Sequence, residues 1–234
     1  MKSFLLIGQS NMAGRGDFGE VPEIENNLCF MLRNGRWQPM VEPINVDRDV
    51  FSLFHSGVGL SASFADEYAK HFGERVGLIP CADGGTKVEE WQPGELLYDH
   101  AVCQAKLAQR TSEIVGILWH QGESDSASEE DVKLYRERFF TMLHAFQNDL
   151  GLPADIPVIL GELGEFVGTF ENGKFQYFTQ INEILEGISE ELPRGGFACA
   201  HGLTCKPDGI HFNSKSYREF GKRYFAEFLR ASEK

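Results

Sequence analysis

The chain has 234 residues, enough for one sizeable domain with a buried core. Its formal net charge of −13 and pI near 5.0 provide no basic surface for phosphates, so we expect neither nucleic acid nor a membrane as a partner. No apolar stretch approaches the roughly 20 residues that span a bilayer. The first apolar run, residues 4–8, is too short for a signal peptide. The sequence as given therefore predicts a cytoplasmic protein, with secretion left open for a chain that has lost a leader.

Short apolar runs bounded by glycine or proline alternate with amphipathic stretches along the chain. The apolar runs predict five strands, at residues 4–8, 76–80, 116–120, 158–161 and, more weakly, 197–200. The amphipathic stretches predict helices over residues 60–72, 96–110, 129–150 and 175–192, and a last helix that begins at Ser214 as its N-cap. This alternation predicts one α/β domain, residues 1–234, with a mainly parallel sheet of about five strands covered by helices on both faces.

Residues 17–49 interrupt the alternation. This segment is rich in Pro, Asn, Glu and Arg and has no clear period. A loop of that length in a compact domain is usually functional. We therefore expect an ordered excursion over the edge of the sheet that carries the site.

Polar, glycine-containing segments follow three of the predicted strands and precede the last helix. They are residues 8–11, 83–86, 120–125 and 208–211. In an open parallel sheet, ligands bind outside the carboxyl ends of the strands. We therefore expect the four segments to meet along one edge and to form the functional site.

These segments contain the groups that acyl transfer requires. A serine hydroxyl needs a base to remove its proton, and His211 can act on Ser10 in this way. Asp208, three residues before His211, can accept the other ring N–H, which sets the tautomer and steadies the imidazolium. We expect this carboxylate to raise the pKa of His211. Taken singly, Ser10 can be a helix cap and Asp208 a turn residue.

A tetrahedral intermediate also needs donors directed at its oxyanion. The backbone N–H of Ser10 is one candidate. The N–H of Gly84 or Gly85 is another, since glycine lets the backbone approach closely. The side-chain amide of Gln121 is the third.

The same segments resemble the sequence blocks of SGNH-type hydrolases. The matching stretches are Gly8-Gln9-Ser10-Asn11-Met12, Gly84-Gly85-Thr86 with Trp91, Trp119-His120-Gln121-Gly122-Glu123-Ser124-Asp125 and Asp208-Gly209-Ile210-His211-Phe212. Among these hydrolases they are most similar to the sialate O-acetylesterase and acetylxylan esterase group, carbohydrate esterase family six. The resemblance runs from residue 7 to 212.

The resemblance implies a three-layer α/β/α, flavodoxin-like fold with Ser10 as nucleophile and Asp208 and His211 as the acid–base pair. It places the oxyanion-hole glycine at Gly84 or Gly85. The wider superfamily has Asn in its third block, whereas this chain has Gln121, as the carbohydrate esterase group does. The implied reaction is removal of O-acetyl groups from a carbohydrate through an acyl-enzyme intermediate, with no cofactor and no metal.

Three further residues are candidates for substrate binding: Gln9, Trp91 and Glu123. Trp91 can stack on a sugar face or pack in the core. Glu123 and Asp125 can orient Gln121 and the neighbouring loops, bind a sugar hydroxyl or be solvated. We favour the supporting role for this pair of carboxylates.

Metal sites are a weaker interpretation of two clusters. The five cysteines are odd in number and scattered, which predicts reduced thiols rather than disulfides. Cys199 and Cys205 flank His201, but zinc sites usually show tighter Cys pairs and four ligands. His120 with Glu123 and Asp125 lacks a second histidine at helical spacing.

Other functional classes remain as alternatives. Residues 57–62 match the G-x-G-x-x-A pattern of dinucleotide-binding oxidoreductases, but residues 50–55 before them make a poor buried strand. That interpretation also leaves Ser10 and His211 without a role. We therefore expect Gly57 and Gly59 to let the loop before the helix pass close to the site. A carbohydrate-binding module would typically be all-β. The nearest alternative is a broad short-chain carboxylesterase or thioesterase on the same fold.

Overall fold

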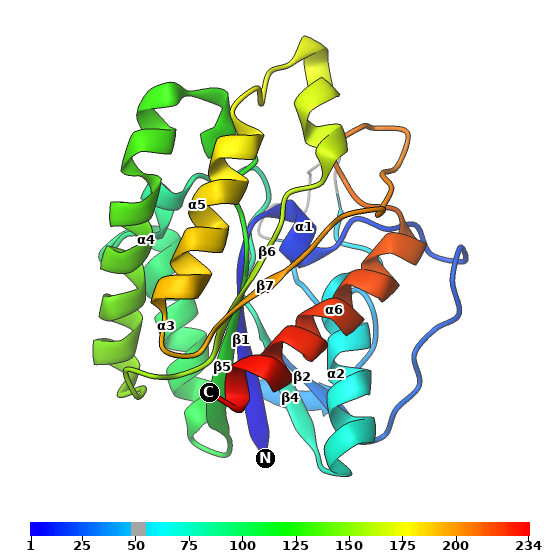
Figure 1. Cartoon of the computed structure of the whole chain (residues 1–234). Coiled ribbons are helices and arrows are strands. Elements are labelled where there is room, and N and C mark those ends of the chain that lie inside the picture. Colours follow the sequence, from blue (N-terminus) through cyan, green and yellow to red (C-terminus); the bar gives the residue numbers. More distant parts are fainter. Residues whose placement is uncertain (48–54) are drawn as a thin grey trace.

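A seven-stranded sheet in the order β3-β2-β4-β1-β5-β6-β7 forms the centre of the protein (Figure 1). The computed structural model describes residues 1–47 and 55–234. Its strands are β1 (Lys2–Gly8), β2 (Cys29–Arg33), β3 (Arg36–Pro39), β4 (Val76–Pro80), β5 (Glu113–His120), β6 (Val158–Gly161) and β7 (Gly195–Ala198). Neighbouring strands pair in parallel except β2 with β3. The order β4-β1-β5-β6-β7 is that of a flavodoxin-like sheet, which confirms the predicted fold class.

Helices cover both faces of the sheet, so the domain has three layers. They are α1 (Ser10–Ala13), α2 (Leu60–Phe72), α3 (Leu96–Gln109), α4 (Glu129–Leu150), α5 (Phe178–Glu191) and α6 (Ser214–Ser232), with short 3-10 helices η1 (Val88–Trp91), η2 (Asp125–Ala127) and η3 (Glu165–Asn172). Figure 1 shows α3, α4 and α5 on one face and α2 and α6 on the other, each burying its own apolar core. Among the described helices, none has both the length and the apolar content needed to cross a bilayer.

The predicted strands and helices are all present, with small shifts at their ends. One cap differs from the prediction. Asn213, not Ser214, is the N-cap of α6, and its side chain accepts a hydrogen bond from the N–H of Ser216 at 2.9 Å. Ser214 is the first helical residue, and its hydroxyl donates to the backbone oxygen of Asp17.

Two of the seven strands lie where the sequence predicts a loop. Residues 29–39 form a hairpin whose first strand, β2, pairs in parallel with β4 and extends the sheet beyond the predicted five strands. The turn is Asn34-Gly35, with φ of 52° and 74°. Positive φ at both positions is the requirement of a type I′ hairpin, and Asn-Gly is its strongest sequence signal. Residues 48 and 49, with the run 50–54, lie outside the described residues.

Aromatic side chains fill the core between the sheet and the helices α2 and α6. Phe4 of β1 meets Phe64 and Phe228 edge to face, at ring-centroid distances of 4.8 and 5.0 Å. Above them the two helices come so close that a Cβ on Gly221 would lie 2.0 Å from the backbone oxygen of Leu60. This contact fixes the position of α6 and of the loop that enters it.

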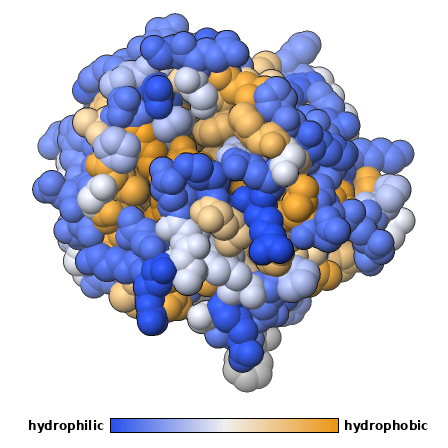
Figure 2. Space-filling model, turned by 90° about the horizontal axis from the view of Figure 1, so that it is seen from below, coloured by the Kyte–Doolittle hydropathy of each residue, from blue (hydrophilic) through white to orange (hydrophobic). Residues whose placement is uncertain are grey.

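Polar side chains lie at both ends of the sheet. Figure 2 views the molecule from the amino ends of the strands, where hydrophilic side chains dominate and apolar ones show between them. The carboxyl ends carry the polar segments that the sequence singled out. In a parallel sheet of this kind a ligand binds at that end, outside the carboxyl ends of the strands.

We predict that Gly221→Ala destabilises the protein, although alanine normally stabilises a helix by about 1 kcal/mol relative to glycine. The added methyl would press against the α2 backbone, which cannot yield as a flexible side chain can. Gly187 of α5 is the matched control, because its Cβ would have no described atom within 4 Å. Thermal unfolding should show a lower Tm for Gly221→Ala and a raised Tm for Gly187→Ala. Equal stabilisation by both changes would contradict the close helix contact.

Candidate active site

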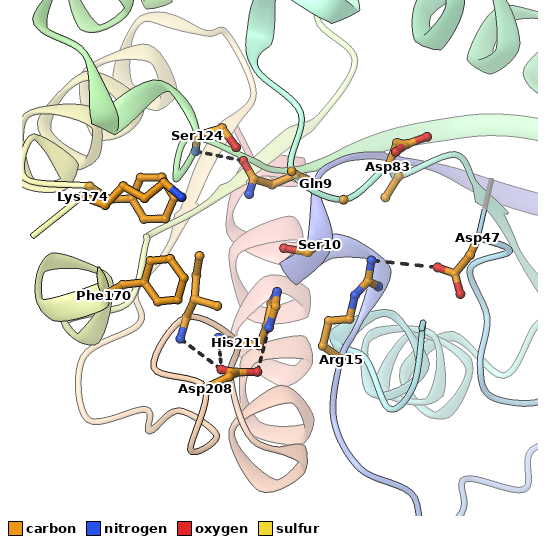
Figure 3. A pocket seen from close by; sticks show the side chains of 15 residues that line it. Gln9, Ser10, Arg15, Asp47, Asp83, Ser124, Phe170, Lys174, Asp208 and His211 are labelled. Atoms are coloured by element: carbon orange, nitrogen blue, oxygen red, sulfur yellow. Dashed lines mark hydrogen bonds and ion pairs between the residues drawn. The ribbon is translucent and has the colours of Figure 1, made fainter. Parts of the chain in front are cut away.

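A cavity of about 450 Å³ lies at the carboxyl ends of the strands (Figure 3). The described residues that line it are Gln9, Ser10, Arg15, Asp47, Ala82, Asp83, Gly84, Gly85, Ser124, Phe170, Lys174, Phe175, Asp208, Ile210 and His211. Each of the four polar segments predicted to meet at this edge contributes to the lining. The meeting point is thus where the flavodoxin-like topology places a ligand.

Ser10 is the first residue of α1, immediately after the turn that ends β1. Gly8 permits this turn because its φ is +131°, and a Cβ there would lie 2.2 Å from the backbone oxygen of His120. N–H groups in the first turn of a helix have no intrahelical acceptor. Ser10 therefore brings a hydroxyl and a backbone donor to the same place.

Asp208 and His211 form a tight turn before α6. One carboxylate oxygen of Asp208 accepts from the backbone N–H groups of Ile210 and His211, at 3.1 and 3.0 Å. The other lies 2.9 Å from His211 Nδ1. Because a carboxylate only accepts, Nδ1 carries the proton and Nε2 is the basic nitrogen. Figure 3 shows His211 and Ser10 reaching the cavity from different elements.

The surroundings keep Asp208 ionised and His211 neutral at neutral pH. Burial favours the neutral form of Asp208, but the hydrogen bonds from His211 and Ile210 outweigh it and lower the pKa of the carboxyl. Burial also lowers the pKa of His211 below 6.5, and the Asp208 carboxylate only partly opposes this. The expected upward shift of the His211 pKa is therefore wrong. Desolvation of the His211 ring lowers its pKa by more than the Asp208 carboxylate raises it, so the ring is neutral at neutral pH.

Gly84 lies directly beside Ser10. A Cβ on Gly84 would stand 3.6 Å from Ser10 Cβ and 2.7 Å from a terminal guanidinium nitrogen of Arg15. Gly85, also at the cavity, has a φ of +76° and open space around it. Of the two glycines that the sequence left open, Gly84 is the one packed against Ser10.

The structure does not bring Gln121 to the cavity. Its side chain is fully buried, and its Nε2 donates to the backbone oxygen of Thr86, to Asp125 Oδ2 and to Gln9 Oε1, at 2.9, 2.5 and 3.2 Å. Gln9 lies between Gln121 and the cavity. A direct contact of Gln121 with a bound oxyanion does not fit this arrangement, because its amide N–H groups are already taken by three buried protein acceptors and the residue does not line the cavity.

Gln9, and not Gln121, brings a side-chain amide to the cavity. Its Oε1 accepts from Gln121 Nε2 and lies 3.3 Å from the N–H of Ser124 and 3.5 Å from that of Gly122. These donors fix which way the amide faces. Figure 3 shows the Gln9 nitrogen turned toward the cavity. Gln9 thus presents a side-chain donor next to Ser10.

Trp91 and Glu123 also lie outside the described lining of the cavity. Trp91 is completely buried against Trp119, with its indole N–H on Thr86 Oγ1 at 3.2 Å, so it is a core residue and not a sugar platform. Glu123 is equally buried and accepts from Asn11. Asp125 accepts from Gln121 and from the N–H of Val88, which is the supporting role expected for it.

Arg15 and Asp47 are cavity residues that the sequence analysis missed. Arg15 is 7% exposed and donates to the backbone oxygen of Gly14 and to Ser56 Oγ, with Asp47 at 3.9 Å. Burial lowers the pKa of Arg15, and Asp47 opposes the shift. The sequence pattern that could have identified Arg15 is its position between two glycines, five residues after the predicted nucleophile. Asp47 shows that the 17–49 segment does reach the site, as expected.

A second missed group forms the outer wall of the cavity. Phe170 and Phe175 stack at 5.4 Å, and Lys174 Nζ lies 5.8 and 5.6 Å from the two ring centres. The turn between them holds Glu171 and Asn172 at φ of 44° and 60°, a left-handed conformation that is rare outside glycine. The sequence of this wall has no periodic pattern that marks it.

Comparison with known proteins agrees with this geometry. Residues 1–230 match the model of one family, described as carbohydrate esterase, sialic acid-specific acetylesterase. The chain belongs to this family.

The chain is also similar to proteins of known structure. The chain is 29% identical over 237 residues to a probable carbohydrate esterase from Arabidopsis thaliana, covering 93% of this chain and 86% of the relative. An Arabidopsis thaliana crystal structure superposes with a TM-score of 0.84 at 28% identity over 98% of both chains. A Xanthomonas citri carbohydrate acetylesterase shares the fold, with a TM-score of 0.70 at 18% identity over 99% of this chain and 56% of that one. Family membership makes this protein an esterase with an acetylated carbohydrate as substrate.

The structure also accounts for the sequence features that suggested a dinucleotide site or a metal site. A Cβ on Gly57 would lie 2.2 Å from the backbone oxygen of Gly16, so this glycine serves a close loop passage. The N–H of Gly59, which a pyrophosphate would need, donates to Glu42. In the described part of the chain, no three His, Cys, Asp or Glu side chains are grouped to hold a metal ion.

We predict that His211 acts as the base and that its lowered pKa sets the pH dependence of the esterase. The base acts when neutral, so kcat/KM should be full at neutral pH and fall with acid through an ionisation below 6.5. Asp208→Asn removes a group that raises this pKa, so the acid limb should move to lower pH while kcat falls steeply. The matched measurement is the pH–rate profile of both proteins on an acetyl ester. A limb above pH 6.5, or near-normal turnover by Asp208→Asn, would contradict this assignment.

Proposed function

We propose that the protein is a serine esterase that removes O-acetyl groups from a carbohydrate of the acetylxylan or sialic acid type through an acyl-enzyme intermediate. The observation that carries this proposal is the placement of Ser10 and the Asp208–His211 pair in one cavity. Family membership supplies the substrate class.

The reaction proceeds in two matched halves. His211 Nε2 takes the proton of Ser10 Oγ as the oxygen attacks the acetyl carbonyl carbon. The tetrahedral intermediate then expels the sugar oxygen, which leaves with that proton as an alcohol. Water then gives a proton to Nε2 as its oxygen attacks the acetyl-serine. Nε2 returns that proton to Ser10 Oγ as the bond between Oγ and the acetyl carbon breaks, and acetic acid leaves and ionises to acetate. Asp208 holds the imidazole in the required tautomer and stabilises its charged form in both halves.

Three donors serve the oxyanion in this proposal: the N–H groups of Ser10 and Gly84 and the side-chain amide of Gln9. The packing of Gly84 against Ser10 and the orientation of the Gln9 amide support this set. Gln121 takes part only through Gln9, whose oxygen it binds. Donors that are fixed before the substrate arrives need no reorganisation as charge develops.

The wall opposite the nucleophile suits a sugar. Phe170 and Phe175 offer aromatic surface for the apolar face of a pyranose ring. Lys174 and Arg15 provide cations, and Asp47 provides a hydrogen-bond acceptor. This mixture favours a polar, ring-shaped leaving group over a long acyl chain.

Ser10 labelling tests the proposal. A serine-directed organophosphonate should inactivate the protein and attach to Ser10, and Ser10→Ala should lose both labelling and turnover. Mass spectrometry of the labelled peptide locates the site. Full labelling of Ser10→Ala at another serine would refute the assignment of the nucleophile.

Substrate choice is measured in parallel with O-acetyl sialic acids, acetylated xylo-oligosaccharides, simple aryl acetates and an acetyl thioester. A higher kcat/KM on one of the carbohydrates is the expected result. Equal rates on the aryl acetate or the thioester would favour a broad short-chain carboxylesterase or thioesterase instead.

Gln9→Met tests the side-chain donor. The change keeps most of the volume and removes the amide. Loss of one oxyanion donor costs about 2.7–4 kcal/mol, or about a hundred- to a thousand-fold in kcat. We expect that fall in kcat with little change in KM. A rise in KM alone would mean that Gln9 binds the ground state of the substrate and not the oxyanion.

A further inference from the structure

Asn11 follows Ser10 on α1, is fully buried and is not among the described residues that line the cavity. Its Nδ2 donates to the backbone oxygen of Ile210 at 3.1 Å, and its Oδ1 accepts from the N–H of Phe212 at 3.3 Å. These two backbone groups flank His211 on either side. Asn11, next to Ser10, is therefore hydrogen-bonded to the backbone on both sides of His211.

Two further contacts determine which way the Asn11 amide faces. The hydroxyl of Tyr217, on α6, donates to Asn11 Oδ1 at 2.6 Å. Glu123 Oε1 accepts from Asn11 Nδ2, also at 2.6 Å. A carboxylate only accepts, so a reversed amide would place oxygen against oxygen at Glu123.

Glu123 is suited to this task because it stays ionised although it is buried. Burial raises its pKa, but the neighbouring His120 imidazole and the Asn11 amide outweigh this and hold the pKa below its ordinary value. Hydrogen bonds to ionised groups are shorter and stronger than neutral ones. Glu123 also comes from the loop after β5, so the contact joins a third element to the pair.

We propose that Asn11 is a positioning residue that sets the separation of Ser10 and His211, and that Glu123 acts through Asn11 by fixing the direction of its amide. This inference rests on the proposed serine mechanism. Ser10 arrives on the turn after β1 and His211 on the loop before α6, two elements separated by most of the chain. Asn11 is a direct side-chain link between them, and proton transfer depends on their distance.

Asn11→Ala should lower kcat by about a hundred-fold, the loss that a displacement of about 1 Å can cause. KM should stay nearly unchanged because Asn11 does not line the cavity. Asn182→Ala is the matched control. Asn182, on α5, grips the N–H and the backbone oxygen of Leu163 in the same manner, at 2.8 and 3.0 Å, but holds the loop after β6. Asn182→Ala should lower the Tm while leaving kcat close to that of the unchanged protein.

Glu123 supplies an independent test should Asn11→Ala not fold. Glu123→Leu removes the acceptor and should lower kcat, whereas Glu123→Gln keeps one and should retain most of it. In the Asn11→Ala background, Glu123→Leu should cost no further kcat, because its effect passes through Asn11. Additive losses would overturn the role of Glu123.

Ser10 labelling separates the two hypotheses. Failure of the unchanged protein to be labelled at Ser10 would refute the serine mechanism itself. Normal labelling together with a wild-type kcat in folded Asn11→Ala, or in Glu123→Leu where the former does not fold, would overturn only the positioning role. Slower labelling of these variants at Ser10 is the expected result.

Discussion

The parallel pairing of β1 with β5, in constant register from Phe4 and Gly116 to Gly8 and His120, is the constraint on which the site depends. The N–H of Gln9 still donates to the oxygen of His120 at 2.9 Å, so the two chains leave the sheet side by side. The turn to Ser10 and the segment 121–125 therefore start from adjacent points. His211 reaches the same place from the far end of the chain, because α6 packs against α2 and holds its entry loop over the sheet.

Beneath the cavity lies a layer of buried polar side chains, an unusual use of core volume. Gln9, Asn11, Gln121, Glu123 and Asp125 are almost or completely inaccessible to solvent. Polar groups in such positions are costly unless they are hydrogen-bonded, and these are bonded mainly to one another and to the backbone. Burial raises the pKa of Asp125 to about 7 even so. The layer stiffens the floor of the site, which suits a catalyst whose donors must be in place before the substrate arrives.

Much of this architecture was predictable from local pattern, since the strands and helices have clear periods and the polar segments end them. The hairpin at 29–39 was missed although Asn34-Gly35 marks it, because its partner β4 is distant in sequence. That Gln9 and not Gln121 lines the cavity was not predictable, since both amides lie at the same edge and the packing decides which faces the cavity. The direction of the His211 pKa shift was not predictable either, because the degree of burial is a property of the assembled fold.

The aromatic wall of the cavity has a consequence for divergence among related esterases. Phe170, Lys174 and Phe175 belong to the connection between β6 and α5, whereas Ser10, Asp208 and His211 stand on other connections. The form of the wall comes from its own left-handed turn, so it is a local unit. Under the proposed function, exchanging this one connection between related esterases would therefore change the wall that faces the sugar and leave Ser10, Asp208 and His211 in place.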